Sequence, residues 1–545
     1  MAIDRSEDRS RSIYIAGGFD GTADFDLVDG AFSLSSDSLS TFVSKIDEAG
    51  NIKWTKAMLG TGGQSYAGAI AVDPADGAIY VRGRFKGTVD FDPGDGVHNI
   101  TGTTTCADIT FCGDNFILKL DSGGNFLWAR VIGASENVFV SSIAIDPGGY
   151  GDVYLTGNFY GTIDFDPGTI TSRLEAMGDY DIFISKLNSS GEFQWAKRIG
   201  GQGNDFSYSI AIDPNGSGEI FTTGYFDKIV DFDPGPGTSS LTSAVSPSIF
   251  ICKLDGDGNF KWAKGMGRAS FLNISHVGSV ALEPGGMGDV YTTGSFKKTG
   301  DFNPSNDDTC KLESAGNSDI FISKLDSAGN FKWAKAAGGL KEDYGTALAI
   351  QPGGSGNVYI IGRFQESVIF GGGSSHLTSS GDYDIFISKF DSAGNFQWVK
   401  AIHGEADDFI AAITLDEESL YLAGFYSSPS ISFDTLTIPN ENEWADLFIA
   451  KLNIADPTSV AEIEKQPFNV YPNPATNELT IEVEGDEVRN LGITIFNVVG
   501  EVVFLSTEQY AFKKETIDIS PLATGIYFLE TNIDGERSII KIVKE

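Results

Sequence analysis

Pairs of acidic residues two positions apart are the groups in this sequence best suited to chemistry. They flank a phenylalanine and recur along the chain, as Asp24 and Asp26, Asp90 and Asp92, Asp164 and Asp166, Asp231 and Asp233, and Asp301 with Asn303. Side chains two apart on an extended segment face the same side, so each pair could offer oxygen ligands to calcium. Paired carboxylates can also be the acid and base of a glycosidase, but a catalytic site is assembled once rather than in every repeat. We therefore expect Asp-Pro-Gly turns at these positions, with calcium binding as the alternative.

Other catalytic or metal-binding patterns are absent from the sequence. The four histidines, His98, His276, His376 and His403, have no zinc-binding spacing, and neither a Gly-x-Ser-x-Gly elbow nor a phosphate-binding Gly-Lys-Ser loop occurs. We interpret His98 and His376 as loop residues and assign no catalytic residue. Cys106 and Cys112 are close enough to form a disulfide in an oxidising compartment.

Composition narrows the class of protein further. The chain has 545 residues, with 75 acidic and 38 basic side chains and a net charge of −37, which repels polyphosphate and makes nucleic acid a poor partner. No apolar run approaches the roughly 20 residues of a transmembrane helix. The 66 glycines and only 5 methionines favour many tight turns between strands. This balance predicts an all-β protein.

An internal repeat organises most of the chain. The phenylalanine of the acidic motif recurs every 68 residues or so, at Phe25, Phe91, Phe165, Phe232, Phe302, Phe370 and Phe433. A tryptophan recurs with the same spacing but only six times, at Trp54, Trp128, Trp195, Trp262, Trp333 and Trp398. Periodic aromatic residues are usually core residues, so we interpret both sets as packing residues rather than a platform for sugars or bases.

Each repeat is expected to contain four antiparallel strands. Examples are residues 209–212, 219–224, 319–325 and the Phe-x-Trp segment 331–335, with the acidic motif as an excursion after the second strand. The turn Asp326-Ser327-Ala328-Gly329-Asn330 and its relatives can close a hairpin, because Asp caps the turn and Gly accepts positive φ. Repeats of this length bury the faces of their sheets by closing into a ring around a central axis. The sequence thus predicts a seven-bladed β-propeller over residues 1–453.

The repeat resembles the bacterial SBBP-type β-propeller repeat. The resemblance rests on residues 319–331, together with the Ala-Ile-x-Pro-Gly-Gly and Val-Tyr-x-x-Gly patterns of other units. It implies the propeller fold and no particular activity.

A different pattern begins after a linker at residues 454–467. Residues 468–545 alternate in six or seven short strands, which indicates a small immunoglobulin-like β-sandwich. This segment resembles the type A C-terminal sorting domain of the type IX (Por) secretion system of Gram-negative bacteria. The resemblance rests on residues 497–503 and 541–545 and on Tyr471, Pro472, Asn473, Pro474, Gly500, Leu522, Gly525, Ile526, Tyr527 and Lys544. It implies recognition by the secretion machinery, removal of the domain by a sortase, and release or attachment at the outer surface of the outer membrane.

The first residues suggest an incomplete first unit. Met1-Ala2-Ile3-Asp4 matches the end of a first strand, and the seventh unit enters the linker at Asn453 without a Phe-x-Trp strand. We expect a three-stranded seventh blade with an exposed edge, and a signal peptide and the missing strand upstream of Met1.

Three functions remain compatible with these patterns. The leading hypothesis is a non-catalytic propeller that binds an extracellular glycan or protein. The alternatives are an extracellular polysaccharide or peptide hydrolase whose site is assembled from different blades, and a structural spacer of the cell envelope. We assign no cofactor, apart from the calcium alternative.

Overall fold

Two compact units make up the chain in the computed structural model. They comprise Met1–Ile454 and Ala455–Glu545. The structure describes residues 1–4, 11–25, 32–60, 62–104, 113–133, 137–168, 170–243, 247–267, 273–305, 308–373, 375–433, 436–440, 445–454, 468–471, 474–483, 489–497, 502–505, 510–512, 514–533 and 536–544. Within these ranges the secondary structure is β apart from one short 3-10 turn, Gly371–Gly373. Over the same ranges there is no helix with the length and apolar character to cross a membrane.

The first unit repeats one antiparallel meander. The first two sheets contain β1 (Ala2–Asp4), β2 (Ser12–Asp24), β3 (Ser33–Ile46) and β4 (Ile52–Met58), and then β5 (Gln64–Val72), β6 (Ile79–Lys86), β9 (Asp114–Leu120) and β10 (Phe126–Ile132). The next three contain β11 (Val138–Ile145), β12 (Val153–Phe159), β15 (Asp181–Leu187) and β16 (Phe193–Gly201); β17 (Phe206–Ile212), β18 (Ile220–Phe226), β21 (Ser248–Leu254) and β22 (Phe260–Met266); and β23 (Asn273–Leu282), β24 (Val290–Lys297), β27 (Asp319–Leu325) and β28 (Phe331–Gly339). The last two contain β29 (Tyr344–Ile350), β30 (Val358–Phe370), β31 (Ser375–Phe390) and β32 (Phe396–Gly404), and then β33 (Asp408–Leu415), β34 (Ser419–Tyr426) and β37 (Asp446–Asn453).

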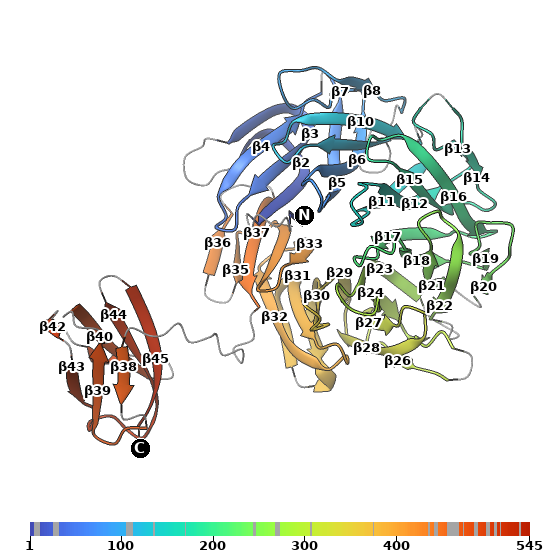
Figure 1. Ribbon diagram of the computed structural model, residues 1–545. Helices are drawn as coiled ribbons and strands as arrows, with labels where there is room; N and C mark the ends of the chain where they lie inside the picture. Colours follow the sequence, from blue (N-terminus) through green and yellow to red (C-terminus); the bar gives the residue numbers. More distant parts are fainter. Residues whose placement is uncertain are drawn as a thin grey trace. The chain divides into compact units, whose positions relative to one another are not determined.

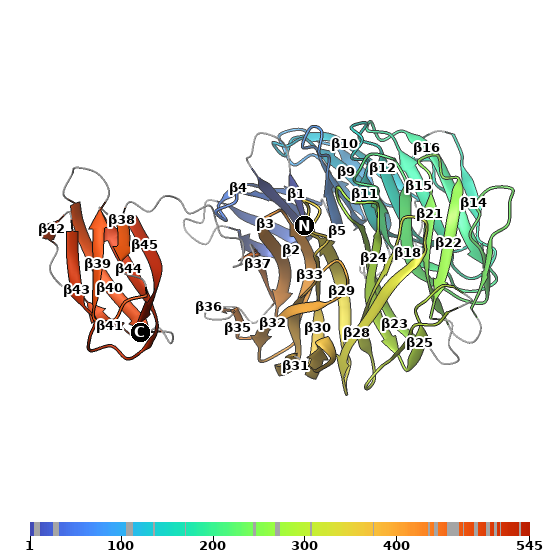
Figure 2. The same cartoon turned by 60° about the horizontal axis from the view of Figure 1, so that its bottom comes forward.

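These sheets are arranged around a central axis, with β5, β11, β17, β29 and β33 among the innermost strands (Figure 1). The view in Figure 2 shows the strands running between the two faces of the ring. All pairings between neighbouring strands are antiparallel, as the sequence predicts.

Most copies of the segment around the repeated phenylalanine lie in short β-ribbons outside the meanders, whereas Asp24 ends β2 and Phe370 ends β30. The ribbons are β7 (Thr88–Asp90) with β8 (Asn99–Thr101), β13 (Thr162–Asp164) with β14 (Arg173–Glu175), β19 (Ile229–Asp231) with β20 (Ser240–Thr242), β25 (Thr299–Asp301) with β26 (Lys311–Glu313), and β35 (Ser430–Phe433) with β36 (Leu436–Pro439). Some fourth strands continue into the ribbon of the next repeat, as β16 pairs with β19. The expected excursion after the second strand is therefore a two-stranded ribbon.

The repeated phenylalanines form the cores of the sheets. Phe91 is completely buried, and its ring centroid lies 5.3 Å from that of Phe85 and 4.9 Å from that of Phe116. Phe165, Phe232, Phe302 and Phe370 are also at most 1% exposed. Their burial supports the packing interpretation and excludes them as an exposed stacking platform.

The tryptophans join each sheet to the next. The indole Nε1 of Trp128 donates a hydrogen bond to the Ser189 carbonyl at 3.0 Å, in the turn between β15 and β16. In the same turn Gly191 has φ +75°, and a Cβ atom there would lie 3.0 Å from the Trp128 ring. Glycine at this position thus provides both the positive φ and the space for the indole.

Lysines of several third strands also reach the next sheet. The Lys324 ammonium lies 4.7 Å from the centroid of the Tyr291 ring and donates a hydrogen bond to the Ser392 carbonyl in the next sheet at 3.2 Å. The same contact joins the last sheet to the first, because Lys451 Nζ donates to the Glu48 carbonyl at 3.4 Å. A core cluster containing Ile13, Ile15 and Tyr421 also spans these two sheets.

Among the described residues, which do not include 455–467, the sheet of β33, β34 and β37 has three strands. Ile454, directly after β37, is 6% exposed and donates its backbone N–H to the Glu418 carbonyl at 2.8 Å. The first compact unit thus extends to Ile454.

The second unit contains two antiparallel sheets around one core. One sheet has β38 (Phe468–Tyr471), β39 (Glu478–Val483) and β43 (Lys514–Asp518); the other has β40 (Arg489–Asn497), β41 (Val502–Leu505), β42 (Tyr510–Phe512), β44 (Gly525–Ile533) and β45 (Glu536–Lys544). Leu479, Ile481, Ile493, Ile495 and Leu529 are at most 1% exposed and join both sheets in one cluster.

Candidate binding surface

The acidic pairs form local hydrogen bonds in the ribbons. Asp164 Oδ1 accepts backbone N–H groups from Asp166 at 3.2 Å and Ser172 at 2.8 Å, and Asp166 Oδ1 accepts that of Gly168 at 2.7 Å. Asp90 with Asp92 and Asp231 with Asp233 repeat this arrangement. The described residues contain no cluster of three or more His, Cys, Asp or Glu side chains suited to a metal. The carboxylates thus have a turn-forming role, and calcium binding at these pairs stays a prediction.

The histidines take several structural positions. His98 lies in a loop with its ring 4.7 Å from Phe126, as expected. His376, in contrast, lies in β31, where its backbone pairs with Ile369 and its Nε2 is 2.6 Å from Ser367 Oγ. The loop interpretation of His376 is wrong because β30 and β31 form one long hairpin that includes the excursion. His403 Nδ1 contacts the buried Asp384 carboxylate at 2.7 Å. Cys106 and Cys112 lie outside the described residues.

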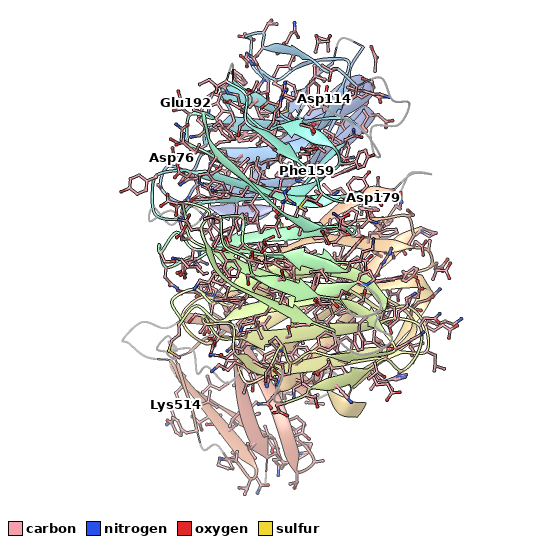
Figure 3. The ribbon with its side chains drawn as sticks, turned by 90° about the vertical axis from the view of Figure 1, so that its right-hand side faces the viewer. Asp76, Asp114, Phe159, Asp179, Glu192 and Lys514 are labelled. Atoms are coloured by element: carbon pink, nitrogen blue, oxygen red, sulfur yellow. The ribbon has the colours of Figure 1, made fainter. Side chains whose placement is uncertain are left out.

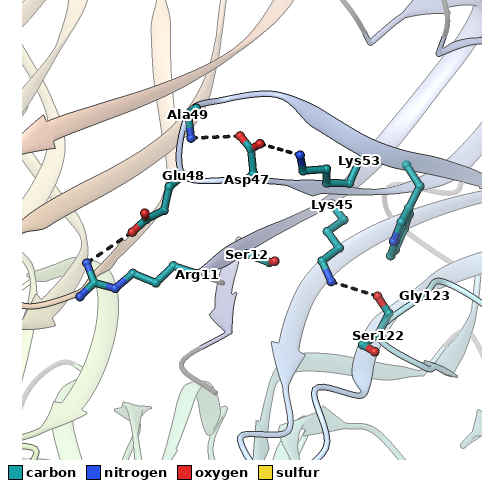
Figure 4. Close-up of a pocket in the computed structure, with 10 residues that line it drawn as sticks. Arg11, Ser12, Lys45, Asp47, Glu48, Ala49, Lys53, Ser122 and Gly123 are labelled. Carbon is teal, nitrogen blue, oxygen red and sulfur yellow. Dashed lines mark hydrogen bonds and ion pairs between the residues drawn. The ribbon is translucent and has the colours of Figure 1, made fainter. Parts of the chain in front are cut away.

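An open cavity of about 650 Å³ lies beside the β3–β4 turn (Figure 4). Its charged side chains are engaged with one another or with backbone groups: Arg11 pairs with Glu48 at 3.4 Å, Lys53 pairs with Asp47 at 2.7 Å, and Lys45 donates to the Ser122 carbonyl at 3.3 Å. These contacts hold the turn and leave none of the three cations without an acceptor. The cavity therefore carries no catalytic assignment.

The two faces of the first unit differ in character. Figure 3 shows Asp76 and Glu192, from hairpin turns, on one side of the unit and Asp179 on the opposite side. At the second face, the first and third strands of each sheet begin and the second strand ends. Here we call it the aromatic face, because rings of several sheets meet there.

A cation–aromatic cluster on the aromatic face centres on Arg363. The Arg363 guanidinium carbon lies 4.9 Å from the Tyr344 centroid, 4.6 Å from that of Tyr383 and 4.9 Å from that of Phe409. Phe409 stacks on Phe425 with 4.9 Å between centroids and an interplanar angle of 19°. Phe425 is 42% exposed, so the stack reaches the surface.

Glu342 fixes the tyrosines of this cluster. Its Oε2 accepts the hydroxyl of Tyr344 and, at 3.1 Å, that of Tyr383, while its Oε1 is 3.2 Å from Lys297 Nζ. The Tyr344 hydrogen bond is the main cause that lowers the pKa of Glu342. The carboxylate therefore stays ionised and holds both rings in place beside Arg363.

A second run of rings lies on the same face. Tyr180 lies between Phe139, at 6.1 Å, and Phe206, at 5.3 Å, and Phe206 is 5.0 Å from Tyr225. Arg84 lies over Phe139, with 4.4 Å from the guanidinium carbon to the ring centroid. Arg84 contacts the ring of Phe139, whereas Arg363 contacts three rings, and arginine beside aromatic rings is a frequent composition of energetically important protein interfaces.

These residues are not among those expected from the sequence. One position in the sequence could have indicated these residues, namely the residue that follows the glycine of each second strand. The residue type at this position changes from repeat to repeat, whereas the neighbouring positions keep the repeat pattern. It is Gly18, Arg84, Asn158, Tyr225, Ser295, Arg363 and Phe425 in turn. Phe425 is 42% exposed at this position, whereas Asn158 and Ser295 are at most 5% exposed.

Buried carboxylates below the aromatic face have raised pKa values. Burial raises the pKa of Asp205 and Asp343 to about 7 and that of Asp319 and Asp408 to about 6. Asp205 Oδ2 accepts the Gly201 N–H at 2.9 Å, and Asp343 Oδ2 accepts that of Gly339 at 2.7 Å. The arrangement is repeated and each side chain is at most 3% exposed. Such groups hold chain segments and do not form a single accessible acid–base pair.

The expected sorting residues lie on both sheets of the second unit. Tyr471 ends β38, is 39% exposed and has Lys514 Nζ 5.3 Å from its ring centroid. Tyr527 on β44 donates its hydroxyl to the Ala523 carbonyl at 2.8 Å, and Gly525 pairs with Lys544 at the end of β45. Pro472, Asn473 and Gly500 lie outside the described residues; Pro474, Leu522 and Ile526 lie within them.

Comparison with known families matches both units. Residues 194–225 match the family described as a β-propeller repeat (SBBP), and residues 469–545 match the secretion system C-terminal sorting domain (Por_Secre_tail). The chain thus contains an SBBP β-propeller repeat and a type IX sorting domain. This domain implies interaction with the type IX machinery and secretion or attachment at the outer surface.

The chain is similar to two curated proteins at low sequence identity. An uncharacterized WD repeat-containing protein of Acanthamoeba polyphaga mimivirus is 25% identical over 461 residues, which cover 72% of this chain and 32% of that protein. The regulatory protein FlaEY of Caulobacter vibrioides is 27% identical over 146 residues, 27% of this chain and 14% of that protein. The chain thus spans a third or less of either relative. The crystal structure of Sqt1 from Chaetomium thermophilum covers 78% of this chain and 93% of its own, with 10% identity and a TM-score of 0.32.

Proposed function

We propose that this chain is an exported binding protein whose seven-bladed propeller recognises an extracellular protein or glycan through the aromatic face. The observation that carries the proposal is the Arg363 cluster, where one guanidinium lies within 4.9 Å of three ring centroids and the adjacent Phe425 is 42% exposed. Rings fixed by neighbouring contacts lose little conformational entropy on binding, which favours affinity.

We propose that the propeller has seven blades, a count that the repeated meander and the contact between the last and first sheets support. The β37 sheet supplies Lys451 to Glu48 in the same way that Lys324 reaches Ser392 one sheet further along. We further propose that the second unit is an immunoglobulin-like sandwich, and that a sortase removes it within residues 455–467 after export.

A hydrolase is the alternative class, and the raised pKa values of Asp343 and Asp408 are the features that favour it. Both carboxylates are at most 3% exposed and hydrogen-bonded to the chain. Substrate therefore cannot reach them without rearrangement of the sheet. A binding role accounts for the exposed rings, which a purely structural spacer would not need.

Export and binding can be tested separately. Deletion of residues 468–545 should leave the propeller in the periplasm, and the intact mass of the surface form should lack this domain. A surface form that keeps its C-terminus would contradict the sorting proposal. Binding is tested by exposing the labelled protein to glycan and extracellular-protein arrays, where at least one ligand class should bind; turnover of a glycan or peptide panel without such binding would favour the hydrolase.

A further inference from the structure

The guanidinium of Arg363 has no hydrogen-bond acceptor among the described residues. Three ring centroids lie within 4.9 Å of its central carbon, but no described oxygen accepts its N–H groups and no described carboxylate forms an ion pair with it. Other partly buried arginines are engaged: Arg198 pairs with Asp181 at 2.8 Å, and Arg130 and Arg82 donate to backbone carbonyl groups. Aromatic rings do not replace these acceptors, because a guanidinium carries five N–H donors.

Glu342, which fixes two tyrosines of the cluster, is paired with another cation. Its Oε1 lies 3.2 Å from Lys297 Nζ, and its Oε2 accepts the hydroxyl groups of Tyr344 and Tyr383. The carboxylate thus contacts the two tyrosines at their hydroxyl ends, whereas Arg363 lies over their rings. Within this group of residues the charge of Arg363 has no ion-pair partner.

The three rings around Arg363 are each next to an aspartate in the sequence. These aspartates, Asp343, Asp384 and Asp408, are completely buried, and each accepts a hydrogen bond from a backbone N–H or a hydroxyl group. Side chains of adjacent residues in extended chain point to opposite sides, so the three carboxylates point away from the rings. The cluster therefore presents a cation and aromatic surface, and its acidic neighbours are engaged elsewhere.

Phe425 provides an exposed flat surface beside the cation. Its ring stacks on that of Phe409 with an interplanar angle of 19°, and the Phe409 centroid lies 4.9 Å from the Arg363 guanidinium carbon. One side of the Phe425 ring is thus covered, while the residue is 42% exposed. The C–H groups of a sugar ring can pack on such an aromatic face, and a guanidinium pairs with a planar carboxylate through two parallel N–H···O bonds. A uronic acid carries both groups on one residue.

We propose that the aromatic face binds an acidic glycan, with the carboxylate of one uronic acid residue paired with Arg363 and the sugar ring of that residue packed against Phe425. This ligand class presupposes the binding function proposed above. One cation beside one exposed ring suits a single sugar residue, whereas a stable protein interface covers about 800 Å² on each partner.

The acidic character of the whole chain does not oppose this contact strongly. Its net charge of −37 repels an anion at long range, but salt screens that repulsion beyond about 8 Å at physiological ionic strength. The carboxylate meets Arg363 in direct contact, where the local positive charge dominates. Short oligomers keep the remaining repulsion small.

The ligand class is tested by isothermal titration calorimetry of the full chain with trimers of galacturonate, glucuronate and mannuronate. Each trimer is compared with the neutral trimer obtained by reducing its carboxylates. At least one acid trimer should bind at least about tenfold more tightly than its neutral counterpart, because a charge-assisted hydrogen bond is lost on reduction. No such preference in any pair would overturn the proposal, including the case in which the chain itself supplies the acceptor. Binding only of sulfated trimers or of an acidic peptide would also overturn it.

Two variants assign the preference to the site. Arg363→Gln should abolish the preference for the acid trimer, whereas Arg173→Gln, which removes an exposed arginine of β14, should leave it unchanged. Equal loss in both would contradict the assigned site, and the comparison of trimers on the natural chain stays decisive if a variant fails to fold. A neutral array ligand whose affinity falls with Arg363→Ala would overturn the acidic ligand but leave the binding face in place. The absence of any array ligand would instead overturn the binding function itself.

Discussion

Lys451 Nζ lies 3.4 Å from the carbonyl oxygen of Glu48, although 403 residues separate them in the sequence. The same pair of sheets is joined by Arg11, whose guanidinium is 3.1 Å from the Asp416 carboxylate. The ring of the first unit is thus held at its junction by side-chain contacts and by the shared core around Tyr421. No strand pairing between the two sheets occurs among the described residues.

Arg11→Ala should weaken this junction. Asp416 is only 7% exposed, so loss of its cation leaves a buried carboxylate, and we expect the unfolding free energy to fall by about 1–2 kcal/mol. Lys53→Ala is the control, because Lys53 is 51% exposed and pairs with Asp47 of its own sheet. For this variant we expect the unfolding free energy to fall by only about 0–1 kcal/mol. Tryptophan fluorescence measures this in urea, since all seven tryptophans lie in the first unit. Equal effects would show that the junction does not depend on Arg11.

The tryptophan–turn contact can be isolated with two glycines. Gly329 and Gly216 both have φ +79°, so alanine costs roughly 1–2 kcal/mol of backbone strain at either. Only Gly329→Ala also places Cβ 3.1 Å from the Trp262 ring and 2.7 Å from Lys264 Cε. We expect a larger drop in melting temperature for Gly329→Ala than for Gly216→Ala. Equal decreases in melting temperature for the two variants would contradict a packing role for the tryptophan–turn contact.

Much of the architecture follows from the sequence because each repeat carries its own strands, turn and core residues. The Asp326–Asn330 turn was predicted from local chemistry, and its Asp326 Oδ1 does accept the Ala328 and Asn330 N–H groups. The Arg363 cluster was not predicted, because it joins Tyr344, Tyr383 and Phe409, from three segments that meet only through the ring. The strand position of His376 was not predicted, because the excursion of the sixth repeat forms part of the β30–β31 hairpin.

The buried carboxylates predict a pH-dependent stability. The folded pKa of Asp343, about 7, exceeds its unfolded value of about 4, so its stabilising contribution is fully present below pH 4 and is lost as pH rises through 7. Each pH unit between the two pKa values corresponds to about 1.4 kcal/mol. Asp343→Asn should therefore reduce the loss of melting temperature between pH 5 and pH 8. An unchanged pH profile would show that Asp343 does not titrate in this range.

Calcium removal should have little effect on the ribbons. Asp90, Asp164 and Asp231 each accept two backbone N–H groups, so the chain itself holds these turns and a chelator should change the melting temperature by no more than about 1 °C. Differential scanning calorimetry with and without chelator measures this. A drop of many degrees, restored by added calcium, would establish the acidic pairs as metal ligands.

The aromatic face is tested most directly by measuring the affinity of the ligand identified on the arrays for two variants of the full chain. Arg363→Ala removes the cation between Tyr344, Tyr383 and Phe409, whereas Tyr150→Ala removes a 77% exposed ring from a turn on the opposite face. Surface plasmon resonance should show at least about tenfold weaker binding for Arg363→Ala, with Tyr150→Ala unchanged and both melting temperatures near that of the natural chain. Unchanged affinity of a folded Arg363→Ala protein would contradict the proposed binding face.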